Sequence, residues 1–541
     1  MLVDSLYLIR IPYMHFRMNA SMLQAGCEAV RKREVFGFKP FGRKSAVILG
    51  AVLYSALAFL PLTAYSHVLP APVRQALKQA RIPESATGIY VHEVGATQPL
   101  LAVNAATAMN PASVMKLVTT FAGLELLGPA YTWKTELYAE GTIRGDTLQG
   151  NLIIKGYGDP KLNLENFWLL TRRLRQTGLR EITGDLVLDS SHFDLPVGDP
   201  AAFDGKPHRS YNVLPEALLV NYRTVALRLL PQPGSKTIRV VVDPLPSLLD
   251  LKNGLTLTNG LCNEWRDALG TDIRTIRTDN DENSRVSIML NGSYSMDCGE
   301  KTLFLSVNDT ASYTFGLFRQ LWEEQGGSFR GKVRAGKAPE GISPLEIHES
   351  PPLSDIVRDI NKFSNNTAAR QLYLALGLTN GMVTGGVKGE AMSAADGRSM
   401  PRATLTKSDM AMQRWLASRR LAFPELIMEN GSGLSRNERI SSRHLGQLLL
   451  AAFQSPVMPE FISSLPIAAV DGTMKKRLNG SATAGQAHIK TGLLEGVKTM
   501  AGYVLDKSGR RVVVVFFVNH PKAGSGQPAM DTLLDWVYER P

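Results

Sequence analysis

Three short elements of this sequence contain residue types that can perform nucleophilic catalysis. The first, Ser113-x-x-Lys116, occurs once in the chain and lies at the start of an apolar run that predicts a helix over residues 114–127. A separation of three residues places both side chains on one face of a helix. A serine becomes a good nucleophile when a neighbouring base takes its proton, and a lysine whose pKa is lowered by burial or by another cation can be that base. Alone, the pattern also fits a helix-capping serine followed by a surface lysine.

The second element is Ser364-x-Asn366, which lies at a break between two predicted helices. Ser-x-Asn occurs elsewhere in the chain, so the pattern alone is not specific and also fits a polar cap between helices. We single out Ser364 because Ile356, Ile360 and Phe363 predict a buried helix face before it. The serine then follows directly on a rigid element.

The third element, Lys490-Thr491-Gly492, also occurs once and lies at the end of a predicted strand. Lysine supplies a cation, threonine supplies a hydroxyl for an anionic group, and glycine lets a substrate approach the backbone closely. Alone, this element fits a solvated lysine before a turn. Ser-x-x-Lys, Ser-x-Asn and Lys-Thr-Gly in this order are the set found in β-lactamases and penicillin-binding proteins.

The surrounding elements indicate how the three could be brought together. Alternating apolar and polar residues predict strands at 88–94, 99–104, 487–490, 499–505 and 511–518. We expect these strands to share one antiparallel sheet whose faces are covered by helices. The middle of the chain, from about 136 to 310, contains many short strand patterns and no long helical pattern. The sequence therefore predicts an α/β (α+β) domain interrupted by a large β-rich insertion.

The first 66 residues have the pattern of a leader. Residues 31–44 are strongly basic, Ala46–Leu60 form an uncharged and mostly apolar run, and small residues follow at Ala64 and Ser66. This is typical of a secretory signal peptide cleaved near Ser66. The alternative is an uncleaved membrane anchor, although the apolar run is at or below the length that spans a bilayer. We expect an exported, periplasmic protein that is soluble or only loosely associated with the membrane.

Composition narrows the function further. The chain has 541 residues, of which 44% are hydrophobic and 20% charged, as in a globular protein. Residues 1–44 hold eight basic and three acidic residues, so they contribute +5 of the net charge of +11. With aromatic content of only 7%, nucleic-acid binding has little support. Cys27 falls in the leader, and the remaining pair, Cys262 and Cys298, predicts a disulfide in an oxidising compartment, with two buried thiols as the alternative.

Residues 75–541 resemble the DacB-type D-alanyl-D-alanine carboxypeptidase/endopeptidases, which are low-molecular-mass penicillin-binding proteins. The resemblance rests on the three elements above and on further motifs at Gly156–Pro160 (GYGDP), Gly184–Leu186 (GDL), Asn361–Lys362, Asn430–Arg436 (NGSGLSR) and Val470–Thr473 (VDGT). The family usually has aspartate where this chain has Asn430, a minor departure if the residue only shapes a turn.

The resemblance implies a serine β-lactamase/transpeptidase-like domain with two smaller domains in the 251-residue gap between Ser113 and Ser364. We expect a leader at 1–66, a peptidase domain at 67–135 and 311–541, a β-rich insertion domain at 136–195 and 265–310, and a nested small domain at 196–264.

The resemblance also implies hydrolysis of the amide between two D-alanines of peptidoglycan stem peptides, through an acyl-enzyme. Ser113 would be the nucleophile, Lys116 its base and Ser364 a proton relay to the leaving amine. The implied substrate-binding residues are Asn366, Lys490, Thr491, Gly492 and Leu493. Asn366 would hold the substrate amide, Thr491 would bind the terminal carboxylate, and the N–H groups of Ser113 and Leu493 would form the oxyanion hole. No metal or organic cofactor is expected, and β-lactams are expected to inhibit by acylating Ser113.

Two further residues are weaker candidates. Asp189 ends a predicted strand of the insertion and Arg436 follows a glycine-rich turn, so either could reach the diamino acid of a stem peptide or be an exposed charge. His192 and His488 could suggest a Ser-His enzyme. We interpret both as structural because Lys116 already supplies a base at the required spacing.

Other functions remain open at this point. A serine β-lactamase needs a residue that activates the deacylating water, and the Glu-x-x-Leu-Asn stretch of class A enzymes is absent. A non-enzymatic wall-binding scaffold would not need the intact serines and lysines, and an esterase or peptidase with unrelated substrates is a third possibility. The preference between carboxypeptidase and endopeptidase substrates stays open, as does a homo-oligomeric state.

Overall fold

The computed structural model describes residues 68–540 apart from 263, 264, 267, 279, 280, 308 and 380–401. The predicted leader at 1–66, with its apolar run Ala46–Leu60, lies outside the described residues. Within the described residues, no helix has both the length and the apolar character needed to cross a membrane.

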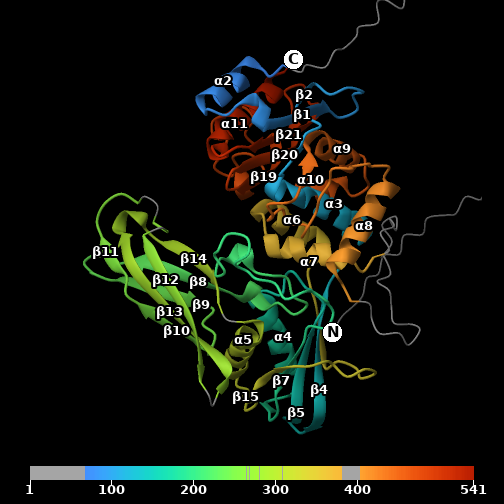
Figure 1. The fold of residues 1–541 in the computed structure, drawn as a ribbon. Helices are drawn as coiled ribbons and strands as arrows, with labels where there is room; N and C mark the ends of the chain where they lie inside the picture. Colours follow the sequence, from blue (N-terminus) through green and yellow to red (C-terminus); the bar gives the residue numbers. More distant parts are fainter. Residues whose placement is uncertain are drawn as a thin grey trace, which may run out of the picture. The chain divides into compact units, whose positions relative to one another are not determined.

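A five-stranded antiparallel sheet brings together the two ends of the described chain (Figure 1). The strand order is β19-β20-β21-β1-β2. The strands are β1 (Thr87–Glu93), β2 (Leu101–Val103), β19 (Ala487–Leu494), β20 (Val497–Leu505) and β21 (Arg511–Asn519). β1 pairs with β21 with Tyr90 opposite Val515. The antiparallel sheet expected from the two distant parts of the sequence is confirmed.

Both faces of this sheet are covered by helices. Because successive side chains of a strand point to opposite faces, Val513 and Phe517 of β21 pack in one cluster with α3 and α9, whereas Val512 and Phe516 pack in another with α2 and α11. The helices of this domain are α2 (Ala71–Gln79), α3 (Lys116–Leu126), α6 (Leu353–Phe363), α7 (Asn366–Leu376), α8 (Leu405–Ser418), α9 (Ser442–Phe453), α10 (Met458–Ser463) and α11 (Gln527–Glu539). A short pair of strands, β3 (Ala108–Met109) and β18 (Ile440–Ser441), joins the start of α9 to the segment before α3.

The insertion contains two groups of strands around one hydrophobic core. A seven-stranded sheet is formed by β4 (Lys134–Arg144), β5 (Thr147–Gly156), β6 (Glu181–Ile182), β7 (Leu186–Asp189), β15 (Ser328–Phe329), β16 (Val333–Ala335) and β17 (Glu346–Glu349). The second group comprises β8 (Thr224–Pro231), β9 (Ile238–Asp243), β10 (Leu249–Asn253), β11 (Thr256–Thr258), β12 (Leu269–Thr278), β13 (Asp281–Ser295) and β14 (Lys301–Ser306). Helices α4 (Leu164–Gln176) and α5 (Thr310–Glu324) contribute to the same core.

Two expectations about local structure were wrong. The insertion does contain a long helix, α4, which Asn163 caps through the N–H of Asn166 and whose Phe167 and Leu174 are buried. Its continuous apolar run at 167–170 resembles the short apolar runs that predict strands, so the helical period was not recognised. Phe363 was expected to be buried with Ile356 and Ile360, but its side chain is 70% exposed. α6 ends at this residue, and the phenyl ring lines cavities beside the helix instead.

The pairing of the strands indicates where the borders of the predicted insertion domains lie. β15–β17 lie in the same sheet as β4–β7, whereas the described strands between 224 and 306 pair among themselves. We therefore propose that the first insertion domain continues to about residue 349 and that the nested domain continues to about residue 306. The division into domains stays a prediction.

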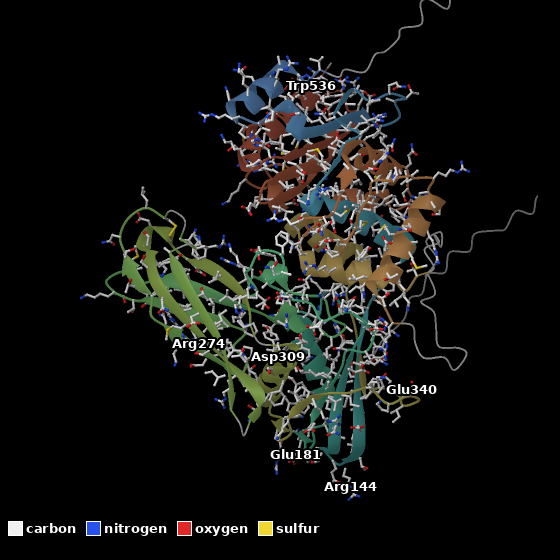
Figure 2. All side chains as sticks on the ribbon, viewed as in Figure 1. Arg144, Glu181, Arg274, Asp309, Glu340 and Trp536 are labelled. Atoms are coloured by element: carbon white, nitrogen blue, oxygen red, sulfur yellow. A yellow bond between two sulfur atoms is a disulfide. The ribbon has the colours of Figure 1, made fainter. Side chains whose placement is uncertain are left out.

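Cys262 and Cys298 form a disulfide in the second group of strands, where it is the sulfur–sulfur bond drawn in Figure 2. Cys298 is 5% exposed and packs in the insertion core. The two cysteines are 36 residues apart in the sequence, so the bond closes a loop that contains β12 and β13.

Candidate active site

Ser113 lies in a short 3₁₀ turn, η2 (Ala112–Met115), directly before α3. The side chain of Asn110 accepts a hydrogen bond from the N–H of Ala112 at 2.9 Å. Thr499 of β20 donates its hydroxyl to the carbonyl of Pro111 at 2.7 Å. The segment directly before the serine is therefore fixed by these two bonds, and the bond from Thr499 holds it against the central sheet.

Lys116 is completely buried and its side-chain nitrogen reaches three oxygen atoms. Nζ lies 3.0 Å from Oγ of Ser113 and 2.6 Å from Oδ1 of Asn366. It also donates to the carbonyl of Ser432. The first and second predicted elements thus meet at a single lysine nitrogen.

Ser364 and Lys490 form a second serine–lysine pair. Ser364 ends α6 in the left-handed conformation, with φ of 58°, which turns the chain sharply before Asn365 caps α7. Nζ of Lys490 donates to Oγ of Ser364 at 2.9 Å and to the carbonyl of Thr491 at 2.7 Å. Lys490 is as fully buried as Lys116.

Strand β19 runs directly beside the nucleophile turn. A Cβ added to Gly492 would lie 2.9 Å from the backbone nitrogen of Ser113 and 2.2 Å from Oγ1 of Thr499, so only glycine fits there without displacement. Thr491 hydrogen-bonds Thr473 through their hydroxyls at 2.8 Å. Leu493, the next residue, is 66% exposed. The third element therefore forms one wall of the site around Ser113.

Two further motifs hold these elements in place. Lys362, at the end of α6, donates to Asp471 at 2.6 Å and to the carbonyl of Leu465 at 2.8 Å, which ties the segment before Ser364 to the loop that carries Thr473. On the other side, the glycine-rich loop 430–436 packs on the nucleophile turn.

The contact of that loop is very close at Gly433. A Cβ there would lie 2.0 Å from the carbonyl oxygen of Ala112, and its φ of +78° also favours glycine. Asn430 shapes the same loop by accepting from the N–H of Ser432 at 3.0 Å and donating to the carbonyl of Leu434 at 3.1 Å.

Burial controls the electrostatics of the site. Desolvation lowers the pKa of Lys116 well below its ordinary value, and the positive charge of Lys490 lowers it further. Burial also lowers the pKa of Lys490, to about 7. The charge of Glu438 acts in the opposite direction and raises the pKa of Lys116. Desolvation raises the pKa of the Glu438 carboxyl to about 7. The site thus favours an uncharged amine at Lys116.

Asp189 and Arg436 occupy different surroundings. Asp189 is 1% exposed and its two carboxylate oxygens accept from the backbone N–H groups of Ser191 and Ala338, at 2.9 and 2.8 Å. Arg436 lies over the ring of Phe203 and donates to the carbonyl of Glu495, at the turn that follows Leu493. Arg436 is therefore close to the wall of the site, whereas the contacts of Asp189 are made within the insertion.

Several residues of the site were not singled out from the sequence. The carbonyl of Ser432, the carboxyl of Glu438 and the hydroxyl of Thr473 come from segments far from the three elements in the chain. The NGSGLSR and VDGT motifs did mark the segments of Ser432 and Thr473, but no spacing rule connects Glu438 to Lys116. His192 packs against Tyr157 with ring centroids 4.9 Å apart, in the insertion.

Comparisons with known proteins agree with this arrangement. Residues 69–537 match the D-Ala-D-Ala carboxypeptidase 3 (S13) family. The chain is 26% identical over 454 residues to the D-alanyl-D-alanine carboxypeptidase of Actinomadura sp. (strain R39), covering 80% of this chain and 78% of that protein. It is 24% identical over 478 residues to the D-alanyl-D-alanine carboxypeptidase DacB of Haemophilus influenzae, covering 88% and 93%.

A solved structure has the same fold. The crystal structure of penicillin binding protein 4 (dacB) from Haemophilus influenzae matches with a TM-score of 0.68 and 23% sequence identity. The match covers 87% of this chain and 100% of that chain. The structure of that protein complexed with a β-lactam matches with a TM-score of 0.64. The helix-covered antiparallel sheet with its β-rich insertion is thus the fold of a penicillin-binding protein, as expected.

The chain belongs to the D-Ala-D-Ala carboxypeptidase 3 (S13) family. It is therefore a serine hydrolase of the D-Ala-D-Ala carboxypeptidase type, and the resemblance to DacB-type enzymes is confirmed.

Proposed function

We propose that Ser113 attacks the carbonyl between the two D-alanines of a peptidoglycan stem peptide, with Lys116 as its base. The observation that carries this proposal is the 3.0 Å distance between Nζ of Lys116 and Oγ of Ser113 at a fully buried lysine. Because desolvation and the charge of Lys490 lower the pKa of Lys116, its amine loses its own proton more readily than a lysine in water and can then accept the serine proton. Attack forms the bond between Oγ and the carbonyl carbon.

Collapse of the tetrahedral adduct expels D-alanine and leaves an acyl-enzyme on Ser113. The leaving amine needs a proton, and the Ser364 hydroxyl, bonded to Lys490, is suited to relay it. The backbone N–H groups of Ser113 and Leu493 would stabilise the oxyanion, a contribution that typically amounts to roughly 10²–10³ in rate. Water then hydrolyses the acyl-enzyme and regenerates the serine.

The remaining site residues would bind the substrate. The Asn366 amide lies beside Lys116 and can hold the amide of the acyl portion. The Thr491 hydroxyl, on the wall formed by β19, would bind the terminal carboxylate together with the cation of Lys490. Gly492 permits the close approach of this strand to Ser113. Arg436 is proposed to contact the diamino acid of the stem peptide, and the same role for Asp189 stays a prediction because its carboxylate already accepts two backbone bonds.

β-Lactams are proposed to acylate Ser113 because they present a strained amide in place of the D-Ala-D-Ala bond. The related penicillin binding protein 4 of Haemophilus influenzae has been crystallised with a β-lactam. Action on peptidoglycan and the export predicted from the leader support the proposal of a periplasmic enzyme of cell wall remodelling. A DD-endopeptidase activity, loose membrane association and a homo-oligomeric state stay predictions.

Release of D-alanine from a pentapeptide that ends in D-Ala-D-Ala tests the proposed function. We expect turnover by the wild type, none by Ser113→Ala and an unchanged rate for Ser463→Ala, a matched substitution at an exposed serine of α10. Cross-linked dimeric peptide tested in parallel measures the endopeptidase activity. Equal turnover by wild type and Ser113→Ala would contradict the proposal.

A further inference from the structure

Exposed aromatic side chains gather at one place on this protein. Among the large apolar side chains that are exposed in the described part of the chain, four are aromatic: Trp168, Tyr211, Phe304 and Phe363. The last three line the same cavity, with exposed fractions of 38%, 54% and 70%. Exposed aromatic side chains beside a cavity leave apolar surface in contact with water, which a ligand would remove.

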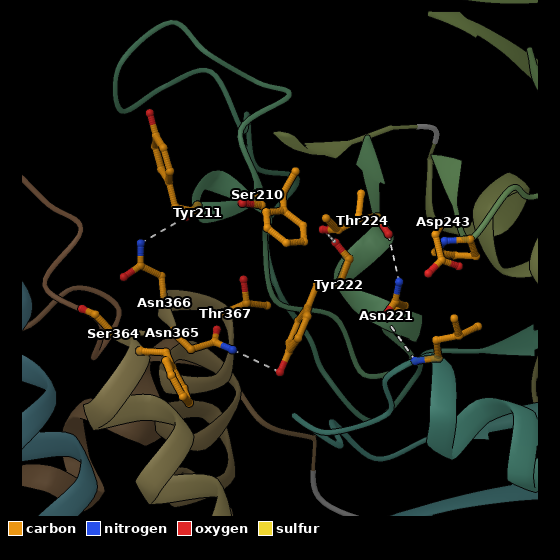
Figure 3. A pocket seen from close by; sticks show the side chains of 15 residues that line it. Ser210, Tyr211, Asn221, Tyr222, Thr224, Asp243, Ser364, Asn365, Asn366 and Thr367 are labelled. Atoms are coloured by element: carbon orange, nitrogen blue, oxygen red, sulfur yellow. Dashed lines mark hydrogen bonds between the residues drawn. The ribbon is translucent and has the colours of Figure 1, made fainter. Parts of the chain in front are cut away.

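The cavity has a volume of about 580 Å³ and lies beside Ser364 and Asn366 (Figure 3). Its walls come from two parts of the chain that are far apart in the sequence. The junction of α6 and α7 supplies one wall, and the insertion supplies the other, including Phe304 of β14. The cavity therefore extends the site from the proposed proton relay toward the insertion.

The lining of this cavity combines apolar side chains with polar ones, and almost none of it is charged. It includes the amides of Asn221, Asn365 and Asn366, and Asp243 is its single charged residue. The hydroxyls of Ser210 and Thr367 also line it, and neither side chain hydrogen-bonds another group in the described part of the chain. The amides hydrogen-bond other groups of the protein, so the two hydroxyls are the groups of this set that are available to a ligand.

Part of the lining is held rigidly. Asn365 donates to the hydroxyl of Tyr222 at 3.1 Å while its own oxygen caps α7, and Figure 3 shows the first of these bonds. Asn221 donates to the carbonyl of Thr224 at 2.9 Å. The cavity walls are therefore fixed by hydrogen bonds that do not use the hydroxyls of Ser210 and Thr367.

A neighbouring cavity differs because many of its lining side chains are charged. It has a volume of about 550 Å³ and shares Phe363, but its lining includes Lys161, Arg358, Lys362 and Lys475 together with three aspartates. Carboxylate-bearing peptide would be attracted by cations such as these. The cavity next to Ser364 and Asn366 contains no lysine or arginine, so its lining does not favour an anionic ligand.

We propose that the cavity lined by Tyr211, Phe304 and Phe363 binds an N-acetylated hexosamine of the glycan strand. A hexosamine is neutral, presents a C–H face that packs on aromatic rings, and carries hydroxyl and acetamide groups around its edge. Those groups match the free hydroxyls of Ser210 and Thr367. The proposal rests on the proposed function, since peptidoglycan is the substrate that carries sugar next to the scissile peptide.

The direct test compares two substrates that differ only in sugar, the free pentapeptide and the same peptide attached to its disaccharide. We expect kcat/KM of the wild type to be higher for the sugar-bearing substrate. Phe304→Ala should reduce this advantage by about fivefold, the effect of roughly 1 kcal/mol of aromatic contact. The rate on free pentapeptide should not change. Trp168→Ala, at the exposed aromatic residue outside the cavity, is the matched control and should leave the advantage intact.

Other outcomes have distinct meanings. Equal kcat/KM for both substrates in wild type and Phe304→Ala, without binding of a free N-acetylglucosamine tetramer by calorimetry, would overturn the proposal. A loss in Phe304→Ala that is equal for both substrates would also overturn it, because the ring would then act on the peptide. Binding of the tetramer by wild type but not by Phe304→Ala, with equal rates on both substrates, would support a sugar from a neighbouring strand. If the proposed function itself fails, neither substrate is cleaved.

Discussion

The surroundings of Lys116 and the aromatic cavity beside them differ in which side chains are buried and which are exposed. Around Lys116, three ionisable side chains, Lys116, Lys490 and Glu438, are fully buried, and hydrogen bonds hold the serines against the lysines. In the cavity, by contrast, large aromatic rings are left exposed and some hydroxyls are left free. Burial is needed to shift a pKa, whereas exposure is needed to receive a ligand.

The same difference separates the residues proposed for the chemical step from those proposed for substrate preference. The buried cluster is assembled almost entirely by the peptidase domain, whereas the cavity needs residues of the insertion such as Phe304. Changes in the cluster should therefore affect the chemical step on every substrate. Changes in the insertion should alter substrate preference or stability and leave acylation of Ser113 by a small β-lactam intact.

The largest effect is expected from Lys116→Met, which removes the base and keeps an apolar side chain of similar length. The rate of Ser113 acylation by a fluorescent penicillin should fall by roughly 10³-fold, within the usual contribution of a general base. Lys78→Met, at an exposed lysine of α2, should have no effect. A residual rate within tenfold of the wild type would show that another group takes the proton.

A smaller but still large loss is expected from Gly433→Ala. The new Cβ would approach the carbonyl of Ala112 within 2.0 Å and displace the nucleophile turn, and a shift of about 1 Å can reduce the rate by roughly 10²-fold. Gly480→Ala is the matched control because its φ of +80° carries the same backbone strain with nothing within 4 Å. Both variants should lose stability, but only Gly433→Ala should lose acylation rate. Equal acylation by the two variants would refute close contact as the cause.

Acylation is also expected to depend on pH in a predictable direction. Lys116 acts without its proton, so the rate should rise as pH rises through its pKa, which lies well below 10.5. Lys490→Met removes a charge that lowers this pKa and should move the rise to higher pH. Glu438→Gln removes a charge that raises it and should move the rise to lower pH. Stopped-flow acylation across pH measures both shifts.

Lys155→Met, in β5 of the insertion, is the control for those pH profiles and should leave the rise in place. If Lys490→Met and Glu438→Gln shifted the profile in the same direction, the electrostatic account of Lys116 would be wrong.

The smallest effect on chemistry is expected when the disulfide is removed by Cys262→Ser with Cys298→Ser. Opening a 36-residue loop should lower the free energy of unfolding by about 3–4 kcal/mol on the loop-entropy account. The acylation rate should change by less than twofold, because the bond lies in the insertion. Thermal unfolding and acylation measured on the same sample test this. A folded variant with a tenfold lower rate would show that the insertion does control the chemical step.

Much of the active site and of the central sheet could be predicted from the sequence. Ser113, Lys116, Ser364 and Lys490 are marked by short motifs because local spacing on a helix or strand end fixes their geometry. The shared antiparallel sheet followed from alternating patterns at both ends of the chain. Those motifs and patterns consist of residues that are close together in the sequence, so they can be recognised without knowledge of the fold.

The remainder depends on contacts between distant segments. Nothing near Glu438 in the sequence indicates that it lies in the field of Lys116. Phe363 follows the apolar period of α6 and was expected to be buried, yet the helix ends there and leaves its ring exposed. α4 was missed because its apolar residues include the continuous run 167–170, which resembles the short apolar runs of the neighbouring strands. Tertiary packing decides each of these cases.

The central claim is that Ser113 is the residue that forms the acyl-enzyme. Intact mass of the purified mature protein, measured with and without benzylpenicillin and beside Ser113→Ala, tests it most directly. The account predicts a stable gain of one penicillin in the wild type and none in the variant. Rapid loss of the drug without an adduct would indicate a β-lactamase, and neither adduct nor turnover would contradict the mechanism.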